Sequence, residues 1–206
     1  MDKFVITIAR QYGSGGKTIG EMLSKKLGVE YYNKDLILKA SEESGINVSL
    51  FANADEHSKG LFKGLKKAKY GDDVLAPSDP NYTSEENLFN IQAKIIRELA
   101  DRESCIIIGR AADYILRDRD NVLSVFVHAP HDFLMEQAAI KHSMSEKELE
   151  KYIAKIDKER AEYYKRHTGR EWTDARNYDL CLNSSKLGFE RCVEEIISYM
   201  NVRFKQ

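Results

Sequence analysis

Near its N-terminus this chain has an apolar run followed by a glycine-rich segment and an amphipathic stretch, an order that few folds accommodate. The run Phe4–Ile8 is rich in β-branched residues, which predicts a buried strand. The segment QYGSGGKT follows at residues 11–18, and residues 17–27 carry apolar side chains at helical spacing. A strand, a tight glycine turn and a helix form a βα unit, which favours a sheet covered by helices.

The same alternation continues along the 206 residues. Further strands are predicted at 30–32, 105–109, 123–128 and 180–183, and helices at 34–44, 84–102, 130–142, 145–167 and 188–203. We therefore predict an α/β fold with a five-stranded parallel sheet flanked by helices. Residues 45–83 interrupt the alternation and hold two of the three prolines, which predicts an insert.

The charges of the chain are nearly balanced, with 32 basic and 33 acidic residues and a net charge of -1. We therefore expect no nucleic-acid partner and no membrane partner, and any basic site must be local. Three cysteines, with Cys105 and Cys181 inside apolar runs, predict a disulfide-free cytoplasmic protein. The apolar run ends at Arg10, too early for a secretory signal, and no stretch approaches the roughly 18 apolar residues of a membrane span.

The glycine-rich segment has the sequence and the context of a phosphate-binding loop. Glycines let backbone N–H groups turn towards an anion, and the N-terminus of the following helix adds partial positive charge. In such a loop Lys17 contacts the outer phosphates and Thr18 binds magnesium. The usual motif has a glycine where Gln11 stands, so we expect Gly13 to supply the turn with positive φ. The alternative is a glycine-rich turn with an exposed lysine. The predicted phosphate-binding residues are Gly13, Ser14, Gly15, Gly16, Lys17 and Thr18.

A second candidate follows the predicted strand 105–109. Arg110 stands at its carboxyl end, the edge of a parallel sheet where ligands bind. An arginine there can hold a phosphate or a carboxylate with two parallel hydrogen bonds. The alternative is an arginine that pairs with Asp113 at the start of a helix.

A third candidate lies in the charged helix 145–167, which we expect to end near Thr168-Gly169. Asp157, Arg160 and Tyr164 share one face of this helix. An arginine so placed can fold over a nucleotide and stabilise charge on a transferring phosphoryl group. The alternative is a solvated helix with an Asp157–Arg160 pair at i,i+3 spacing.

Together these stretches resemble the cytidylate kinase-like family, a branch of the P-loop nucleoside monophosphate kinases, over nearly the whole chain. The resemblance rests on Ile8-Ala9-Arg10 and GSGG at 13–16, Leu27-Gly28 with YNKDLI at 32–37, GRAAD at 109–113, DKERAEYY at 157–164, WTD at 172–174 and NYDLCLNSS at 177–185. It implies a five-stranded parallel sheet with an NMP-binding lobe and a lid. On that basis the core is 1–44, 84–142 and 168–206, the lobe is 45–83 and the lid is 143–167.

The resemblance also implies roles for particular residues. Lys17 and Thr18 bind ATP and Mg²⁺, and Arg110 binds the acceptor. Lys39 stands where cytidylate kinases place an arginine for the acceptor phosphate. The lid contributes Asp157 and Arg160, which with Lys17 are the expected catalytic residues.

Two further carboxylates stand near predicted strand ends. Asp35, which we also place near the acceptor, and Asp113 can help to hold Mg²⁺, or each can cap its helix. Three differences from the family leave the acceptor open: Asn33 replaces an aspartate, Ala111 replaces an acidic residue, and Met135–Lys141 lacks the usual arginines.

The function that these features predict is phosphoryl transfer from MgATP to a small acceptor, in particular the pyrimidine nucleoside monophosphates CMP and dCMP. Such a protein needs no covalent intermediate, because catalysis depends on positioning the two substrates and stabilising charge on the phosphoryl group. One alternative is a kinase of another small metabolite. The other is a nucleotide-binding regulatory protein without turnover.

Overall fold

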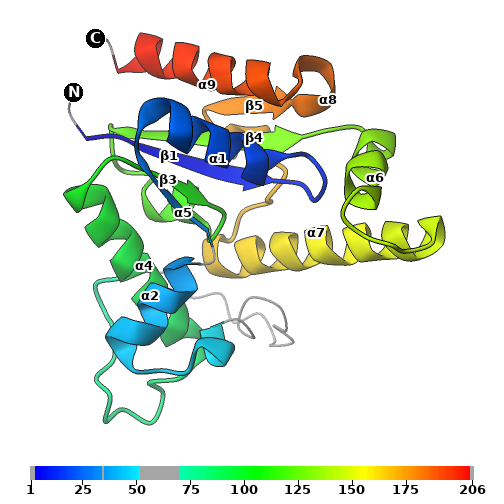
Figure 1. The fold of residues 1–206 in the computed structure, drawn as a ribbon. Coiled ribbons are helices and arrows are strands. Elements are labelled where there is room, and N and C mark those ends of the chain that lie inside the picture. The colour runs from blue at the N-terminus through cyan, green and yellow to red at the C-terminus, as the bar shows by residue number, and fades with distance from the viewer. Residues whose placement is uncertain (1–2, 34, 52–69, 205–206) are drawn as a thin grey trace.

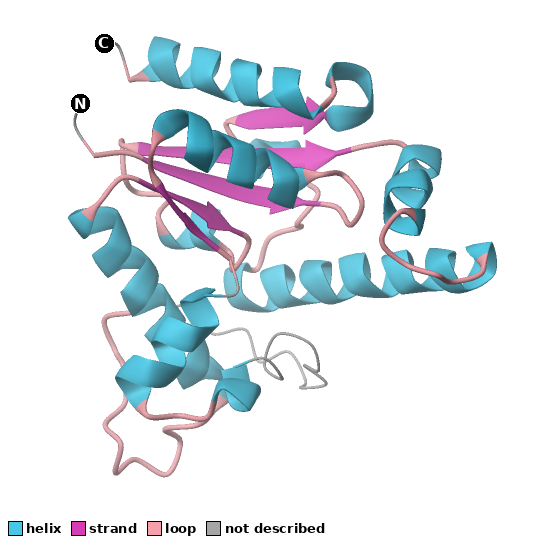
Figure 2. Ribbon diagram, in the orientation of Figure 1, coloured by secondary structure: helices cyan, strands magenta, loops and turns pink. Residues whose placement is uncertain are grey.

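The computed structural model describes residues 3–33, 35–51 and 70–204. Five parallel strands form one sheet in the order β2-β3-β1-β4-β5 (Figures 1 and 2). The strands are β1 Val5–Arg10, β2 Glu30–Tyr32, β3 Cys105–Ile108, β4 Val122–His128 and β5 Leu180–Asn183. The predicted α/β fold with a five-stranded parallel sheet is confirmed, and each strand lies within two residues of its predicted bounds.

The helices also follow the predicted pattern. The longer ones are α1 Gly16–Leu27, α2 Asp35–Ser44, α4 Glu85–Arg102, α6 His131–Ala139, α7 Glu146–Thr168 and α9 Phe189–Arg203. The short ones are α5 Ala112–Ile115, α8 Ser184–Leu187 and a 3₁₀ turn at Ala175–Asn177. The predicted helix 130–142 is too long, because α6 ends at Ala139 and the chain then turns back to pack α7 against α6. The short helices were not predicted, since four residues show no periodicity.

Alternation along β1 shows why both faces of the sheet are covered. Val5 and Ala9 belong to a core cluster with residues of α4 and α5, whereas Ile6 and Ile8 pack with residues of α1 and α9. Figure 1 shows the sheet between these two helical layers. Because all the strands are parallel, their carboxyl ends lie at one edge, and the glycine-rich loop and Arg110 both follow strands at that edge.

The predicted lobe is described only in part, since residues 52–69 lie outside the described residues. Its last part, 70–83, is fixed to α2 and α4. The Tyr82 hydroxyl donates to the carbonyl oxygen of Ser44 at 2.7 Å, and Asn87 Oδ1 accepts from the N–H of Leu75 at 2.8 Å. The assignment of 45–83 as an NMP-binding lobe stays a prediction.

The predicted lid segment forms most of α7, a single helix of 23 residues. Leu149 and Ile153 pack against Ala138 of α6, while Tyr163 and Tyr164 belong to the core cluster under the sheet. The helix ends where the sequence indicated, at Gly169 with φ 71°. Its assignment as a moving lid stays a prediction.

All three cysteines are free thiols, as predicted. Cys105 is buried in the central part of the sheet, but Cys181 is exposed because β5 is an edge strand. None of the helices in the described part of the chain has both the length and the apolar character needed to cross a bilayer.

Candidate functional site

The glycine-rich loop connects β1 to α1 at the carboxyl edge of the sheet. Gly13 and Gly15 have φ of 81° and 79°, the left-handed region that favours glycine. A Cβ on Gly13 would lie 2.5 Å from the carbonyl oxygen of Leu134, and one on Gly15 would lie 2.2 Å from the Phe189 ring. Gly13 therefore supplies the turn with positive φ, as expected.

Gln11 serves the loop through hydrogen bonds. Its backbone N–H donates to the carbonyl oxygen of Val127 at 3.0 Å, and its side-chain oxygen accepts from the N–H of Ala129 at 3.2 Å. Its own carbonyl oxygen accepts from the buried Ser14 hydroxyl at 2.8 Å. Gln11 thus holds the loop against the end of β4, and the Ser14 hydroxyl closes the turn within the loop.

The start of α1 retains free backbone donors. The first helical bond runs from the N–H of Ile19 to the carbonyl oxygen of Gly15 at 2.9 Å, so the N–H groups of residues 16–18 precede the helical ladder. In the part of the chain that the structure describes, no side chain caps this end and the first turn holds no acidic residue. A helix start of this kind attracts anions, which fits the triphosphate of ATP.

Lys17 does not line the pocket at the sheet edge. Its side chain is 59% exposed, and its Nζ lies 3.5 Å from the Glu21 carboxylate one turn along α1. A contact between Lys17 and a phosphate in the loop therefore requires the side chain to leave Glu21. Thr18 next to it is half-buried.

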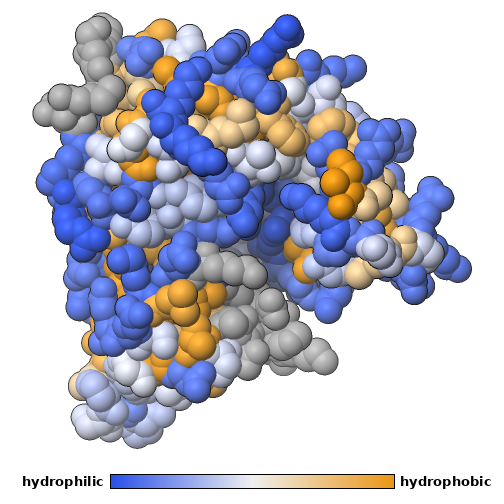
Figure 3. All heavy atoms as spheres, in the orientation of Figure 1, coloured by the Kyte–Doolittle hydropathy of each residue, from blue (hydrophilic) through white to orange (hydrophobic). Residues whose placement is uncertain are grey.

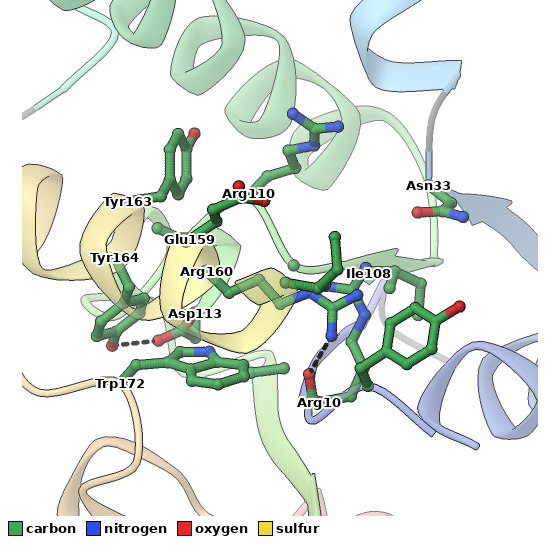
Figure 4. Close-up of a pocket in the computed structure, with 15 residues that line it drawn as sticks. Arg10, Asn33, Ile108, Arg110, Asp113, Glu159, Arg160, Tyr163, Tyr164 and Trp172 are labelled. Atoms are coloured by element: carbon green, nitrogen blue, oxygen red, sulfur yellow. Dashed lines mark hydrogen bonds between the residues drawn. The ribbon is translucent and has the colours of Figure 1, made fainter. Parts of the chain in front are cut away.

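A pocket of about 290 Å³ lies beside the loop, between the sheet edge and α7. Figure 3 shows the surface hollowed between the sheet layer and the α6–α7 arm, with hydrophilic residues around the hollow. Three arginines from three elements line the pocket: Arg10 ends β1, Arg110 follows β3, and Arg160 belongs to α7 (Figure 4). The structure thus brings Arg110 and Arg160 together, as the sequence predicted, and adds Arg10.

Asp157 and Arg160 connect α7 to the loop. The Asp157 carboxylate accepts from the N–H of Tyr12 at 2.8 Å and from Arg160 at 3.0 Å. Arg160 also donates to the carbonyl oxygen of Arg10 at 3.1 Å. Burial raises the pKa of Asp157 and lowers the pKa of Arg160, and the attraction between the two charges opposes both shifts. The i,i+3 pair considered as the alternative is present, but it is half-buried and positions Arg160 at the pocket.

Tyr12 is a site residue that the sequence analysis missed. Its hydroxyl lies 2.5 Å from Nε2 of His142, and its ring meets the Tyr152 ring edge-on at 5.4 Å. Burial is the main reason that its pKa rises to about 12, so the hydroxyl stays protonated at neutral pH. An aromatic residue inside a glycine loop was the available signal, because such a residue needs a packing partner.

The turn after β3 has an unusual backbone. Gly109, Arg110 and Ala111 are consecutive left-handed residues with φ of 70°, 60° and 50°. Two non-glycine residues in this region cost roughly 1–3 kcal/mol each and persist only where the surroundings hold them. The turn closes through a bond from the N–H of Ala112 to the carbonyl oxygen of Gly109 at 3.1 Å.

Asp113 also lines this pocket, and its carboxylate already has a hydrogen-bond partner. Its carboxylate accepts from the Tyr164 hydroxyl at 2.6 Å (Figure 4). Burial raises the pKa of Asp113 to about 6, despite this bond and the nearby backbone N–H groups. The bond to Tyr164 favours a structural role for Asp113 over the metal ligation considered from the sequence.

Asp35 and Lys39 on α2 do not line the pocket, although Asn33 just before them does. Asp35 is exposed, and Nζ of Lys39 lies 5.6 Å from the centre of the Tyr32 ring. Among the residues described, no group of three or more His, Cys, Asp or Glu side chains is arranged to hold a metal.

Comparison with known proteins agrees with this geometry. The model of the cytidylate kinase-like family matches residues 5–186. The cytidylate kinase of Pyrococcus horikoshii is 25% identical over 186 residues, which cover 90% of this chain and 82% of that protein.

Two solved structures share the fold. An uncharacterized protein from Eubacterium ventriosum has a TM-score of 0.72 at 23% identity, covering 97% of this chain and 99% of that one. The shikimate kinase from Bacteroides thetaiotaomicron has a TM-score of 0.55 at 16% identity, with 96% and 98% covered. These likenesses show a P-loop kinase fold. Since the family match spans the loop, the arginine pocket and α7, the chain belongs to the cytidylate kinase-like family.

Proposed function

We propose that this protein transfers the γ-phosphoryl group of MgATP to a pyrimidine nucleoside monophosphate, CMP or dCMP, in the cytoplasm. The observation that carries the proposal is the convergence of Arg10, Arg110 and Arg160 in one pocket beside an uncapped helix start. Phosphoryl transfer needs such a concentration of positive charge, because the phosphate oxygens of donor and acceptor repel each other. The family and the name of the Pyrococcus horikoshii relative support the choice of reaction and acceptor.

On the donor side, the backbone N–H groups between Gly13 and Thr18 would hold the ATP phosphates. Lys17 would join them after leaving Glu21, and the Thr18 hydroxyl would be a ligand of Mg²⁺. When bound, Mg²⁺ offsets negative charge on the phosphate oxygens. Asp35 is exposed and free to approach the ion, whereas Asp113 is occupied by Tyr164.

On the acceptor side, Arg110 would bind the monophosphate. Lys39 and Asp35 would add contacts if α2 moves towards the pocket, since neither lines it here. Arg160 would stabilise the transferring phosphoryl group, with Asp157 holding its guanidinium in place.

A coupled assay of ADP release with MgATP tests this proposal. We expect turnover with CMP and dCMP and weaker turnover with UMP and AMP. A panel of small hydroxyl metabolites, including shikimate, serves as the comparison set. Turnover with a metabolite and none with the four monophosphates would replace the proposal with a metabolite kinase. Tight ATP binding without any transfer would indicate a regulatory protein.

A further inference from the structure

The side chain of Arg10 runs between two glycines. A Cβ on Gly16, the first residue of α1, would lie 2.5 Å from Cβ of Arg10. A Cβ on Gly109, after β3, would lie 2.5 Å from Nη1 of Arg10. Any other residue at either position would collide with the arginine as it stands. The two glycines therefore give Arg10 a path from the start of α1 to the turn that carries Arg110.

The guanidinium of Arg10 has no partner within the described residues, where it makes neither a hydrogen bond nor an ion pair. Burial, with the neighbouring cations Arg160 and Arg110, lowers its pKa to about 9, so it remains charged at neutral pH. The Asp157 carboxylate attracts this charge and partly opposes the fall in pKa, but it makes no ion pair with Arg10. A desolvated cation without a directly paired counterion costs free energy in the folded protein. An anion in the pocket would remove that cost.

A second polar group in the same pocket also lacks a partner. The Tyr163 hydroxyl is buried and has no hydrogen-bond partner in the described part of the chain. Tyr163 comes from α7 and is 8% exposed. The hydroxyl has almost no surface accessible from the empty pocket, so Arg10 rather than Tyr163 is the group that a ligand there can reach. A charged donor of this kind fits a ligand rich in acceptor oxygens, such as a phosphate.

We propose that Arg10 is the protein cation that binds the outer phosphates of the nucleotide, the role that the loop motif assigns to Lys17. This inference rests on the function proposed above. Arg10 ends the strand that feeds the loop and lines the pocket with Arg110 and Arg160, whereas Lys17 faces outward to Glu21. A guanidinium at this point can bind two phosphate oxygens at once, which an ammonium group cannot.

The test compares four variants of the full chain. Arg10→Met removes the charge but keeps a stem between the glycines, and Arg10→Lys restores a charge without the fork. Lys17→Met removes the competing cation. Arg119→Met is the matched control for the loss of one arginine. Arg119 forms an ion pair with Asp101 and does not line the pocket that holds Arg10. The readouts are ADP affinity by calorimetry, kcat and KM with MgATP and CMP, and thermal unfolding without ligand.

We expect Arg10→Met to weaken ADP binding or kcat/KM by about 10- to 100-fold, the effect of one lost charge-assisted contact, and by more than Lys17→Met does. Arg10→Lys should recover part of the loss, and Arg119→Met should keep the ADP affinity, kcat and KM of the wild type. The unliganded Arg10→Met protein should melt at the same temperature as the wild type or higher, because an uncompensated charge is gone.

Three results would overturn the inference: a larger loss in Lys17→Met, wild-type binding and rates in Arg10→Met, or a lower melting temperature as the sole change. These results are distinct from a failure of the proposed function, which would appear as a wild type that binds ADP but phosphorylates no monophosphate. In that case the ADP affinities still decide between Arg10 and Lys17.

Discussion

Two pockets of this molecule are lined by arginines, and they differ in how the charges are balanced. The first, of about 290 Å³, lies at the carboxyl edge of the sheet and holds Arg10, Arg110 and Arg160. The second, of about 170 Å³, lies beside the start of β4 and β5. It is lined by five arginines: Arg117, Arg119, Arg170, Arg176 and Arg203.

Three arginines of the second pocket are paired with carboxylates of the protein. Arg119 pairs with Asp101 at 2.7 Å, and Arg176 pairs with Asp174 at 2.7 Å. Arg203 pairs with Asp179 just before β5. These charges are satisfied within the protein, so an incoming anion would have to displace a carboxylate.

The first pocket is balanced differently. Arg160 forms an ion pair with Asp157, but no carboxylate within the described residues forms an ion pair with Arg10. The number of arginines alone therefore does not identify an anion site. A site is indicated where positive charge is concentrated and the protein supplies too little negative charge to satisfy it.

The largest effect should follow from Arg160→Ala in the first pocket. We expect kcat to fall by roughly 100- to 1,000-fold with a smaller change in KM for ATP, because the contact strengthens as charge develops on the phosphoryl group. Steady-state kinetics with MgATP and CMP measure both quantities. A wild-type kcat in Arg160→Ala would show that Arg160 only pairs with Asp157 and takes no part in catalysis.

A smaller effect is expected from Arg110→Lys, which keeps the charge but loses the planar fork. The KM for the monophosphate should rise by about 10- to 100-fold, while ATP affinity should barely change. Kinetics with CMP and calorimetry with ATP separate the two. Loss of ATP affinity with acceptor binding intact would place Arg110 on the donor side.

Asp113 lines both pockets, and its substitution tests stability rather than catalysis. Its pKa of about 6 lies above the usual 3.8, so the folded protein holds this proton more tightly than the unfolded chain does. That contribution to stability is fully present below pH 3.8 and is lost as the pH rises through 6.

Asp113→Asn keeps an acceptor for the Tyr164 hydroxyl and removes the titration. Relative to the wild type, its free energy of unfolding should increase between pH 4 and pH 6 by on the order of 1–3 kcal/mol. Urea unfolding at pH 4, 5, 6 and 7 measures this difference. A difference that does not vary with pH would contradict the assigned cause.

The smallest effect should come from Arg119→Met in the second pocket. The pair with Asp101 is solvent-exposed on the aspartate side, and such pairs contribute up to about 1 kcal/mol. We expect a loss of stability below that limit and unchanged ADP affinity. Weaker ADP binding would show that the second pocket also takes nucleotides, and the contrast between the pockets would fail.

Local patterns in the sequence were sufficient for most of the architecture. The strands and the longer helices follow from apolar periodicity, and the end of α7 follows from Gly169. The sequence also indicated the loop with Gly13, and the pocket residues Arg110 and Arg160. It placed the end of α6 too late, because that end is fixed by packing against α7 rather than by residues 140–142 themselves.

The βα order, the glycine loop and the arginines after β3 and within α7 follow directly from the sequence. Which charges lie close together depends on how the chain folds in three dimensions. Arg10 ends a strand and Lys17 belongs to a loop motif, yet the fold places the first, half-buried, in the pocket and pairs the second with Glu21. The physical reason is that a charge is balanced by atoms within a few ångströms, and those atoms come from elements far apart in the chain.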